Sequence, residues 1–198
     1  MIKKLLTVAF LLAFTAASVM AAVLNYGVDT AHSTVGFSVP ILGGLSKVTG
    51  KFTDFTVNIA YDEADITKSS VRATIKTASI NTGIQRRDDH LRTADFFDAE
   101  KYPEITFQSK RIEKKGDKLF AIGDLSMHGV TKEVTLPFSI SGVNKGQSGP
   151  PTYGFSARMP LNRIDFGISY KRRDNPAFIG DIVEVQINVL TRVERKKE

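Results

Sequence analysis

The residues of this chain that could do chemistry are concentrated between Arg86 and Arg92, where the sequence reads RRDDHLR. The histidine and the two carboxylates directly before it could serve as acid and base, and the arginines could bind an anion. The alternative is a solvated, ion-paired helix face, because the charges alternate in sign and their net field is small. Arg86 and His90 lie four residues apart, which places both on one face of a helix.

Familiar catalytic patterns are absent from the sequence. It contains no G-x-S-x-G elbow, no H-E-x-x-H, no phosphate-binding loop and no dinucleotide fingerprint. There is no cysteine, which excludes disulfides, thiolate nucleophiles and cysteine-ligated metals. The three histidines, His32, His90 and His128, lack the spacing of metal ligands, so a three-histidine metal site assembled by the fold is the weaker alternative. We therefore expect that the protein is not an enzyme and that it has no catalytic residue, metal or cofactor.

The stretch from residue 81 to residue 103 must position the charged cluster, and its apolar residues recur at helical rather than strand spacing. Asn81 or Thr82 is expected to cap the start of the helix. Asp88 precedes Arg92 by four residues, the favourable order for an ion pair on a helix. The pattern predicts one short polar helix in a chain that otherwise has the pattern of a sheet protein.

Nearly everything outside this stretch alternates apolar and polar residues with period two, as half-buried strands do. The sheet is expected to begin with a strand over residues 28–39. The phase shifts by one residue near Thr53 and Asp54, which predicts a β-bulge, and Pro137 predicts an edge or bent strand. About eight antiparallel strands joined by hairpins predict an all-β barrel, because closure removes the exposed edges of a sheet.

The helix is followed by Phe96 and Phe97, and this pair predicts a lid over one end of the barrel. The interior of an eight-stranded barrel is either filled by side chains or holds one small ligand. The 13 phenylalanines are the main large apolar residues, since tryptophan is absent. Composition alone does not separate a solid core from a tunnel lined with apolar side chains.

The first 21 residues have the pattern of a cleaved signal peptide. Lys3 and Lys4 precede the apolar run from Leu5 to Ala17, and small residues follow up to Ala21. A membrane anchor is the alternative, but the run is shorter than the roughly 20 residues that a span needs. Residues 22–198 would form one exported domain, and loss of the two lysines lowers its formal charge from +6 to +4. Export and modest charge argue against a nucleic-acid partner.

Several motifs in order along the chain make it resemble the bacterial YceI-like family of exported, polyisoprenoid-binding proteins. The resemblance covers about Tyr26 to Val193, and its strongest part is the run RDDHLRTADFF from Arg87 to Phe97. The other motifs are Ala31-His32-Ser33 before VGFSV at 35–39, Gly50-Lys51-Phe52, Asp54-Phe55, Lys101-Tyr102-Pro103, Ile105-Thr106-Phe107, Gly123-Asp124-Leu125, Gly129-Val130-Thr131-Lys132 and Asp165-Phe166-Gly167.

The resemblance implies a lipocalin-like, eight-stranded antiparallel barrel around an apolar tunnel. It implies a periplasmic protein that holds a polyisoprenoid chain, such as a quinone or polyprenyl lipid, for transport or storage. A homodimer and a membrane partner are further expectations. Two alternatives stay open: an envelope stress or interaction protein with a filled barrel, and a lipid-modifying enzyme that uses His90 with Asp88 or Asp89.

On this interpretation inward strand residues line the tunnel, Phe96 and Phe97 close its mouth, and Arg86, His90 and Arg92 face the head group. Many relatives carry a histidine where this chain has Ile41, which points to a less polar ligand end or another ligand. The expected ligand-binding residues are Phe37, Val39, Phe52, Ile75, Arg86, His90, Arg92, Phe96, Phe97, Ile105, Phe107, Leu125, Phe138, Phe155, Phe166 and Val185.

Overall fold

The computed structural model describes residues 23–147 and 149–193, so the expected signal peptide lies outside the described residues. The described chain forms one antiparallel sheet with a single α-helix, α1 (Gln85–Arg92). None of the helices in these two ranges is long and apolar enough to cross a membrane. The strands are β1 (Leu24–Val28), β2 (Thr34–Ile41), β3 (Ser46–Phe52), β4 (Phe55–Tyr61), β5 (Ser70–Lys76), β6 (Ile80–Asn81), β7 (Glu104–Lys115), β8 (Lys118–Met127), β9 (Val130–Asn144), β10 (Thr152–Asn162) and β11 (Ile182–Val193).

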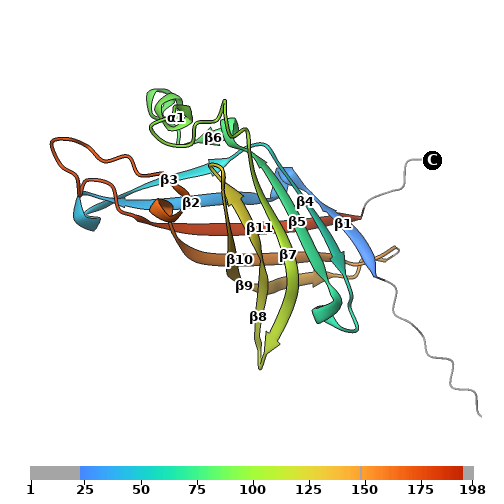
Figure 1. Cartoon of the computed structure of the whole chain (residues 1–198). Coiled ribbons are helices and arrows are strands. Elements are labelled where there is room, and N and C mark those ends of the chain that lie inside the picture. The colour runs from blue at the N-terminus through green and yellow to red at the C-terminus, as the bar shows by residue number, and fades with distance from the viewer. Residues whose placement is uncertain (1–22, 148, 194–198) are drawn as a thin grey trace, which may run out of the picture.

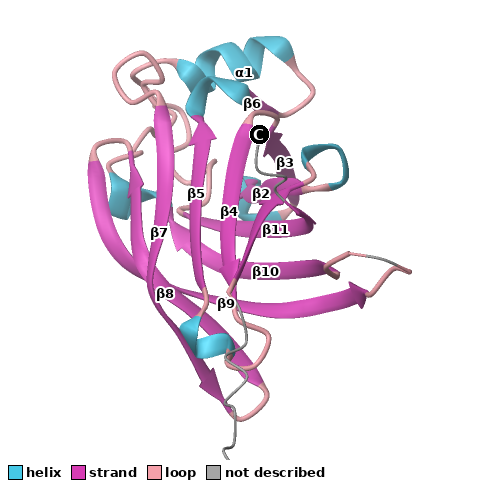
Figure 2. Ribbon diagram, turned by 90° about the vertical axis from the view of Figure 1, so that its right-hand side faces the viewer, coloured by secondary structure: helices cyan, strands magenta, loops and turns pink. Residues whose placement is uncertain are grey.

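Eight of these strands close into a barrel. Each pairs with its neighbour in the order β1, β4, β5, β7, β8, β9, β10 and β11, and β11 pairs back with β1. The predicted eight-stranded antiparallel barrel is confirmed, and α1 lies over one end of it (Figure 1). Strands β9, β10 and β11 cross the direction of β4, β5 and β7 at a steep angle, so the two halves of the wall face each other across the interior (Figure 2).

The barrel wall is longer on one side, because β2, β3 and β6 continue the sheet beyond the eight strands of the barrel. Strands β1 and β2 both lie along β11, where Val28 opposes Thr191 and Thr34 opposes Asn188. The prediction of one strand over residues 28–39 is wrong at residues 29–33, because Asp29 caps a short 3₁₀ turn by accepting a hydrogen bond from the N–H of Ala31 at 3.0 Å. Strands β3 and β4 are separated by a bend at residues 53–54, where the sequence predicted a bulge.

Strands β9 and β10 separate along part of their length. Their last paired residues are Phe138 and Ala157. Beyond that pair, the first half of β9 is paired only with β8 and the last part of β10 only with β11. Pro137 and Pro160 lie on the separating segments, where a residue without a backbone N–H costs least. The edge position expected for Pro137 is therefore confirmed.

Three tyrosines close the barrel at the end opposite α1. Tyr26 from β1, Tyr61 from β4 and Tyr153 from β10 are all buried, and the ring centroids of Tyr61 and Tyr153 are 4.5 Å apart. The hydroxyls of Tyr26 and Tyr153 have no hydrogen-bond partner in the described chain. This end is thus packed with aromatic rings, and free volume is found nearer α1.

Candidate functional site

Helix α1 is fixed at its start by a carboxylate from inside the helix. The Oδ1 atom of Asp88 accepts hydrogen bonds from the backbone N–H of Thr82, at 2.8 Å, and from the Thr82 hydroxyl. Arg87 donates from Nε to the same hydroxyl at 2.7 Å and from Nη2 to the Thr82 carbonyl at 3.0 Å. The prediction that Asn81 or Thr82 caps the helix is wrong, because the N-cap is Ile84 and Thr82 lies too far before the first turn.

Arg92 fastens the other end of the helix to the sheet. Its Nε and Nη2 atoms donate to the carbonyls of Ala78 and Ile80 at 2.8 and 3.0 Å, and Nη1 pairs with Asp89 at 2.9 Å. The predicted ion pair with Asp88 is not formed, because Asp88 is turned toward Thr82. All three donor nitrogens of Arg92 are therefore used to hold the helix in place.

The chain after α1 brings an aromatic cluster to the barrel end. Phe96 is buried, and its ring centroid lies 5.0 Å from that of His90 and 4.7 Å from that of Tyr170. Phe97 packs edge-on against Phe52 of β3 at 6.1 Å. Tyr170 belongs to the segment between β10 and β11, so two separate parts of the chain meet over this end of the barrel.

A buried arginine holds the second segment that covers this end of the barrel, the loop of residues 167–181. Arg163 is 5% exposed and donates to the carbonyls of Gly180, Ile168 and Tyr170 at 3.0, 2.7 and 3.1 Å. Its Nη2 atom pairs with Asp181 at 2.9 Å. Burial lowers the pKa of Arg163, and the carboxylate of Asp181 opposes that shift. Arg163 thereby ties both ends of the loop together.

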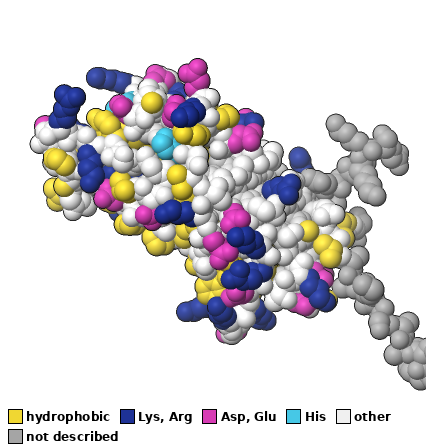
Figure 3. Space-filling view, in the orientation of Figure 1, with side chains coloured by type: hydrophobic (Ala, Val, Ile, Leu, Met, Phe, Trp, Pro, Cys, Tyr) yellow, Lys and Arg dark blue, Asp and Glu magenta, His cyan; other side chains and the backbone are white. Residues whose placement is uncertain are grey.

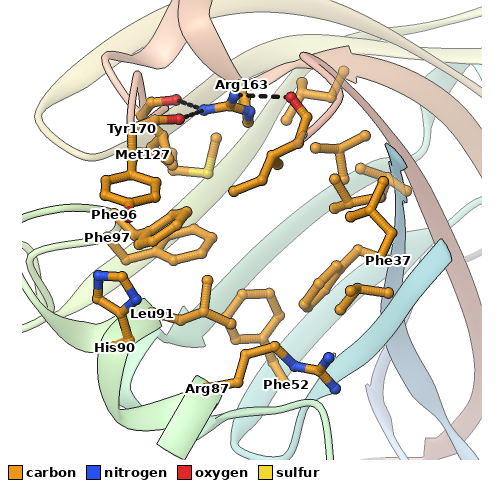
Figure 4. A pocket seen from close by; sticks show the side chains of 18 of the residues that line it. Phe37, Phe52, Arg87, His90, Leu91, Phe96, Phe97, Met127, Arg163 and Tyr170 are labelled. Carbon is orange, nitrogen blue, oxygen red and sulfur yellow. Dashed lines mark hydrogen bonds between the residues drawn. The ribbon is translucent and has the colours of Figure 1, made fainter. Parts of the chain in front are cut away.

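Two apolar cavities lie end to end beneath these covers. The one nearer α1 has a volume of about 530 Å³ and the deeper one about 220 Å³. Figure 4 shows the larger cavity, with Phe96, Phe97 and Tyr170 on one side, Phe37 on the other, and Arg87 beside Phe52. Both cavities are lined by the same six side chains where they meet, which are Phe37, Phe52, Ile105, Met127, Leu161 and Val185. The barrel therefore encloses apolar free volume on both sides of these six side chains, and we call the two cavities together the tunnel.

The comparison with known families agrees with this architecture. A model of the YceI-like domain matches residues 26–190. The chain belongs to the YceI-like family. Protein YceI from Escherichia coli O157:H7 is 38% identical over 167 residues, which cover 84% of this chain and 87% of that protein.

Two solved structures share the fold of this YceI-like chain. BcnA from Burkholderia cenocepacia superimposes with a TM-score of 0.72 at 27% identity, over 82% of this chain and 98% of BcnA. A polyisoprenoid-binding domain from Saccharophagus degradans, implicated in plant cell wall breakdown, has a TM-score of 0.60 at 15% identity, over 87% of this chain and 99% of that domain. At that identity the second likeness extends to the fold alone.

Most residues expected from the YceI-like pattern lie on the tunnel wall. Those that line it are Phe37, Val39, Phe52, Ile75, His90, Phe96, Phe97, Ile105, Phe107, Leu125, Phe138, Phe155 and Val185. Three do not. Arg86 is exposed on the outer side of α1, Arg92 is bonded to the sheet, and Phe166 is buried beside β8, where its carbonyl lies 3.1 Å from Nδ1 of His128. Ile41, where relatives often carry histidine, lines the larger cavity.

Sequence reasoning missed the charged and loop residues of the larger cavity, which are Arg87, Arg163, Ile168, Tyr170, Arg172, Phe178 and Ile179. The direction of a side chain such as that of Arg87 depends on its hydrogen bonds in the folded chain, and the sequence does not indicate it. Tyr170 and Phe178 could have been found from the sequence, since they are the two aromatic residues of this loop.

The lining of the larger cavity contains four basic side chains and no acidic one. Three of the four have a carboxylate partner: His90 pairs with Asp95 at 2.8 Å, Arg163 with Asp181, and Arg172 with Asp174. The hydrogen bonds between Arg172 and Asp174 raise the pKa of the arginine and lower that of the carboxyl. Within the described ranges, Arg87 is the lining cation without a carboxylate ion pair, and its Nη1 atom has no hydrogen-bond partner.

The alternative acid–base pairs are not assembled. His90 bonds to Asp95, while Asp88 is held by Thr82 and Asp89 by Arg92 and Gln85. Among the described residues, no three histidine, aspartate or glutamate side chains are close enough together to hold a metal ion. The side chains that converge at this site are apolar and aromatic, with basic groups at the mouth.

Proposed function

We propose that this protein binds an amphiphile with a long apolar chain, such as a quinone or polyprenyl lipid, and carries or stores it in the periplasm. The observation that carries the proposal is the tunnel of two apolar cavities that share six lining side chains. The larger cavity, about 530 Å³, falls in the range of roughly 300–1,000 Å³ typical of small-molecule sites, and the deeper one adds about 220 Å³. The apolar N-terminal run supports export, and the fold shared with a polyisoprenoid-binding domain supports an isoprenoid chain.

The chain of the ligand would lie along the apolar strand residues. Each buried CH₂ group contributes about 0.8 kcal/mol, so a long hydrocarbon is retained without specific hydrogen bonds. A filled barrel, the alternative considered from sequence, would leave no such room. Binding along the tail would be tolerant of chain type, and selectivity would be exerted at the mouth.

The polar head would lie at the mouth beside Arg87 and His90. Arg87 lines the larger cavity, whose described lining contains no acidic side chain, and its Nε and Nη2 atoms are bonded to Thr82 while Nη1 is not. Arg87 takes the place that the sequence pattern assigned to Arg86. A carbonyl, hydroxyl or phosphate oxygen could accept from it.

The test is native mass spectrometry of the protein purified from its own periplasm, followed by organic extraction of the same sample. We expect a stoichiometric added mass that is released on extraction and identified as a prenyl amphiphile. Phe107→Asp places a charge on the tunnel wall and should abolish retention, whereas Gln108→Asp, its outward neighbour on β7, should retain the cargo. A ligand-free mass that stays unchanged after incubation with quinones and polyprenyl lipids would refute the proposal.

A further inference from the structure

The barrel end that carries the β2–β3 hairpin exposes large apolar side chains. Leu45 is 88% exposed, Ile182 50% and Leu42 44%. Isolated exposed apolar residues are ordinary on a protein surface. Three at one end of the molecule, beside a cavity mouth, form a patch that is available to a partner.

The backbone holds this patch in place. Leu42 has a φ of 53°, in the left-handed region that glycine or asparagine adopts more easily. Its N–H donates to the carbonyl of Phe178 at 2.9 Å, and the N–H of Gly180 donates to the carbonyl of Pro40 at 2.8 Å. The hairpin turn and the loop before β11 are therefore one surface, which we call the tip and define as residues 42–47 and 171–182.

Cations surround the apolar part of the tip. Lys47, Lys171 and Arg173 are exposed, and none has a carboxylate partner within the described residues. The two acidic residues of the tip, Asp174 and Asp181, are already paired with Arg172 and Arg163. The uncompensated charge of the tip is positive. In Figure 3 the end of the molecule with the hairpin and this loop shows Lys and Arg side chains next to hydrophobic ones.

The tip borders the mouth of the tunnel. Ile41, Arg172, Phe178 and Ile179 lie within or beside the tip, and all four line the larger cavity. An amphiphile leaving the tunnel at this end would emerge among exposed leucines and unpaired cations. This combination matches the boundary of an anionic bilayer, with acyl chains below and phosphates above.

We propose that the tip docks on an anionic lipid bilayer. Leu42, Leu45 and Ile182 would enter the boundary between head groups and acyl chains, and Lys47, Lys171 and Arg173 would lie on the lipid phosphates. Docking sets the tunnel mouth against the membrane, so that a chain can pass between bilayer and barrel with little exposure to water. The inference rests on the proposed function for its purpose, since the membrane is the source or destination of the amphiphile.

The test is flotation with vesicles of phosphatidylcholine alone or with about a third phosphatidylglycerol, where each basic residue near the surface is expected to matter by roughly fivefold. The protein is used from Ala22 onward, because the apolar run Leu5–Ala17 would itself bind bilayers and the strands of the described residues lie within Leu24–Val193. We expect binding to the anionic vesicles and much weaker binding to the neutral ones.

Two double variants test the two halves of the surface. Leu42→Asn with Leu45→Asn should weaken binding at least tenfold, and asparagine suits the left-handed backbone at position 42. Lys171→Gln with Arg173→Gln should weaken it about 25-fold. The matched controls lie elsewhere on the barrel: Ile140→Asn with Val143→Asn removes two exposed apolar side chains, and Lys114→Gln with Lys145→Gln removes two exposed cations. Both controls should bind as the unchanged protein does.

Equal binding of the tip variants and their controls, or no binding of the unchanged protein, would overturn the proposal. So would a dimer in sedimentation equilibrium that dissociates in the leucine variant without any vesicle binding, because the patch would then cover a second copy. The lipid content of the same preparations is measured by extraction. A cargo-free protein that still floats with anionic vesicles would refute the proposed function and leave the docking inference standing.

Discussion

The carboxylate of Asp88 holds Thr82 by two hydrogen bonds, one from the backbone N–H at 2.8 Å and one from the hydroxyl. Asp88 is only 4% exposed. The same hydroxyl accepts a hydrogen bond from Arg87, so one threonine joins the buried carboxylate to the cation at the tunnel mouth. The helix over the barrel is therefore positioned by a side chain of its own first turn.

Asp88→Ala should lower the free energy of unfolding by about 2 kcal/mol, because charge-assisted hydrogen bonds to a buried group are lost. In a domain of this size the melting temperature should fall by roughly 4–8 °C. Asp89→Ala is the control, since its side chain is 59% exposed, and it should change stability by less than about 0.5 kcal/mol. Equal effects of the two substitutions in thermal unfolding would contradict the anchoring role.

The two neighbouring arginines of α1 should differ in ligand binding. Arg87→Gln should weaken binding of a soluble prenyl alcohol such as farnesol about fivefold to tenfold, because one direct hydrogen bond at the mouth is lost. Arg86→Gln should leave the affinity unchanged, since Arg86 is outside the tunnel lining. Displacement of an apolar fluorescent probe measures both. A larger loss in Arg86→Gln would move the head group to the outer face of the helix.

The difference between these arginines marks where prediction from sequence stopped. Period-two alternation was enough for the barrel, and the phase shift at residues 53–54 was enough for the bend between β3 and β4. In strands, one apolar residue fixes the orientation of every neighbour, and that is why ten of the expected residues on strands lie along the two cavities. An eight-residue polar helix has no such constraint, and its rotation is decided by the contacts of Asp88 and Arg92 with distant backbone.

The loop of residues 167–181 was also beyond sequence reasoning. Its shape depends on Arg163, whose acceptors lie from 5 to 18 residues away along the chain. No local pattern encodes such a set of bonds. Phe166 was expected among the ligand-binding residues, but it is buried in the turn before this loop, where its carbonyl lies 3.1 Å from Nδ1 of His128.

Arg163→Met should destabilise the protein strongly. It leaves the carbonyls of Gly180, Ile168 and Tyr170 without their donor, and such losses in buried networks cost about 3–5 kcal/mol in total. Urea unfolding measures the change. Arg158→Met is the control, because that side chain is 68% exposed and should matter by less than about 0.5 kcal/mol. A loss below about 1 kcal/mol for Arg163→Met would show that the loop is held by other contacts.

The tyrosine cluster at the closed end predicts a loss of stability at high pH. Burial, followed by the nearby charge of Glu63, raises the pKa of Tyr153 to about 12 from an ordinary value of 10.0. The unfolded chain therefore releases this proton near pH 10, whereas the folded protein keeps it until about pH 12. Stability from Tyr153 is fully present below pH 10 and is lost progressively as the pH rises toward 12.

Tyr153→Phe removes both this titration and a buried hydroxyl that has no hydrogen-bond partner. At pH 7 the variant should be as stable as the unchanged protein or more stable by about 1 kcal/mol, because an unsatisfied polar group is gone. Between pH 10 and pH 12 its melting temperature should fall less steeply, with a remaining slope from Tyr26 and Tyr61, whose pKa values are also raised by burial. If Tyr153→Phe and the unchanged protein lose stability in parallel over this range, the phenol of Tyr153 ionises alike in the folded and unfolded chain and the closed end is open to water.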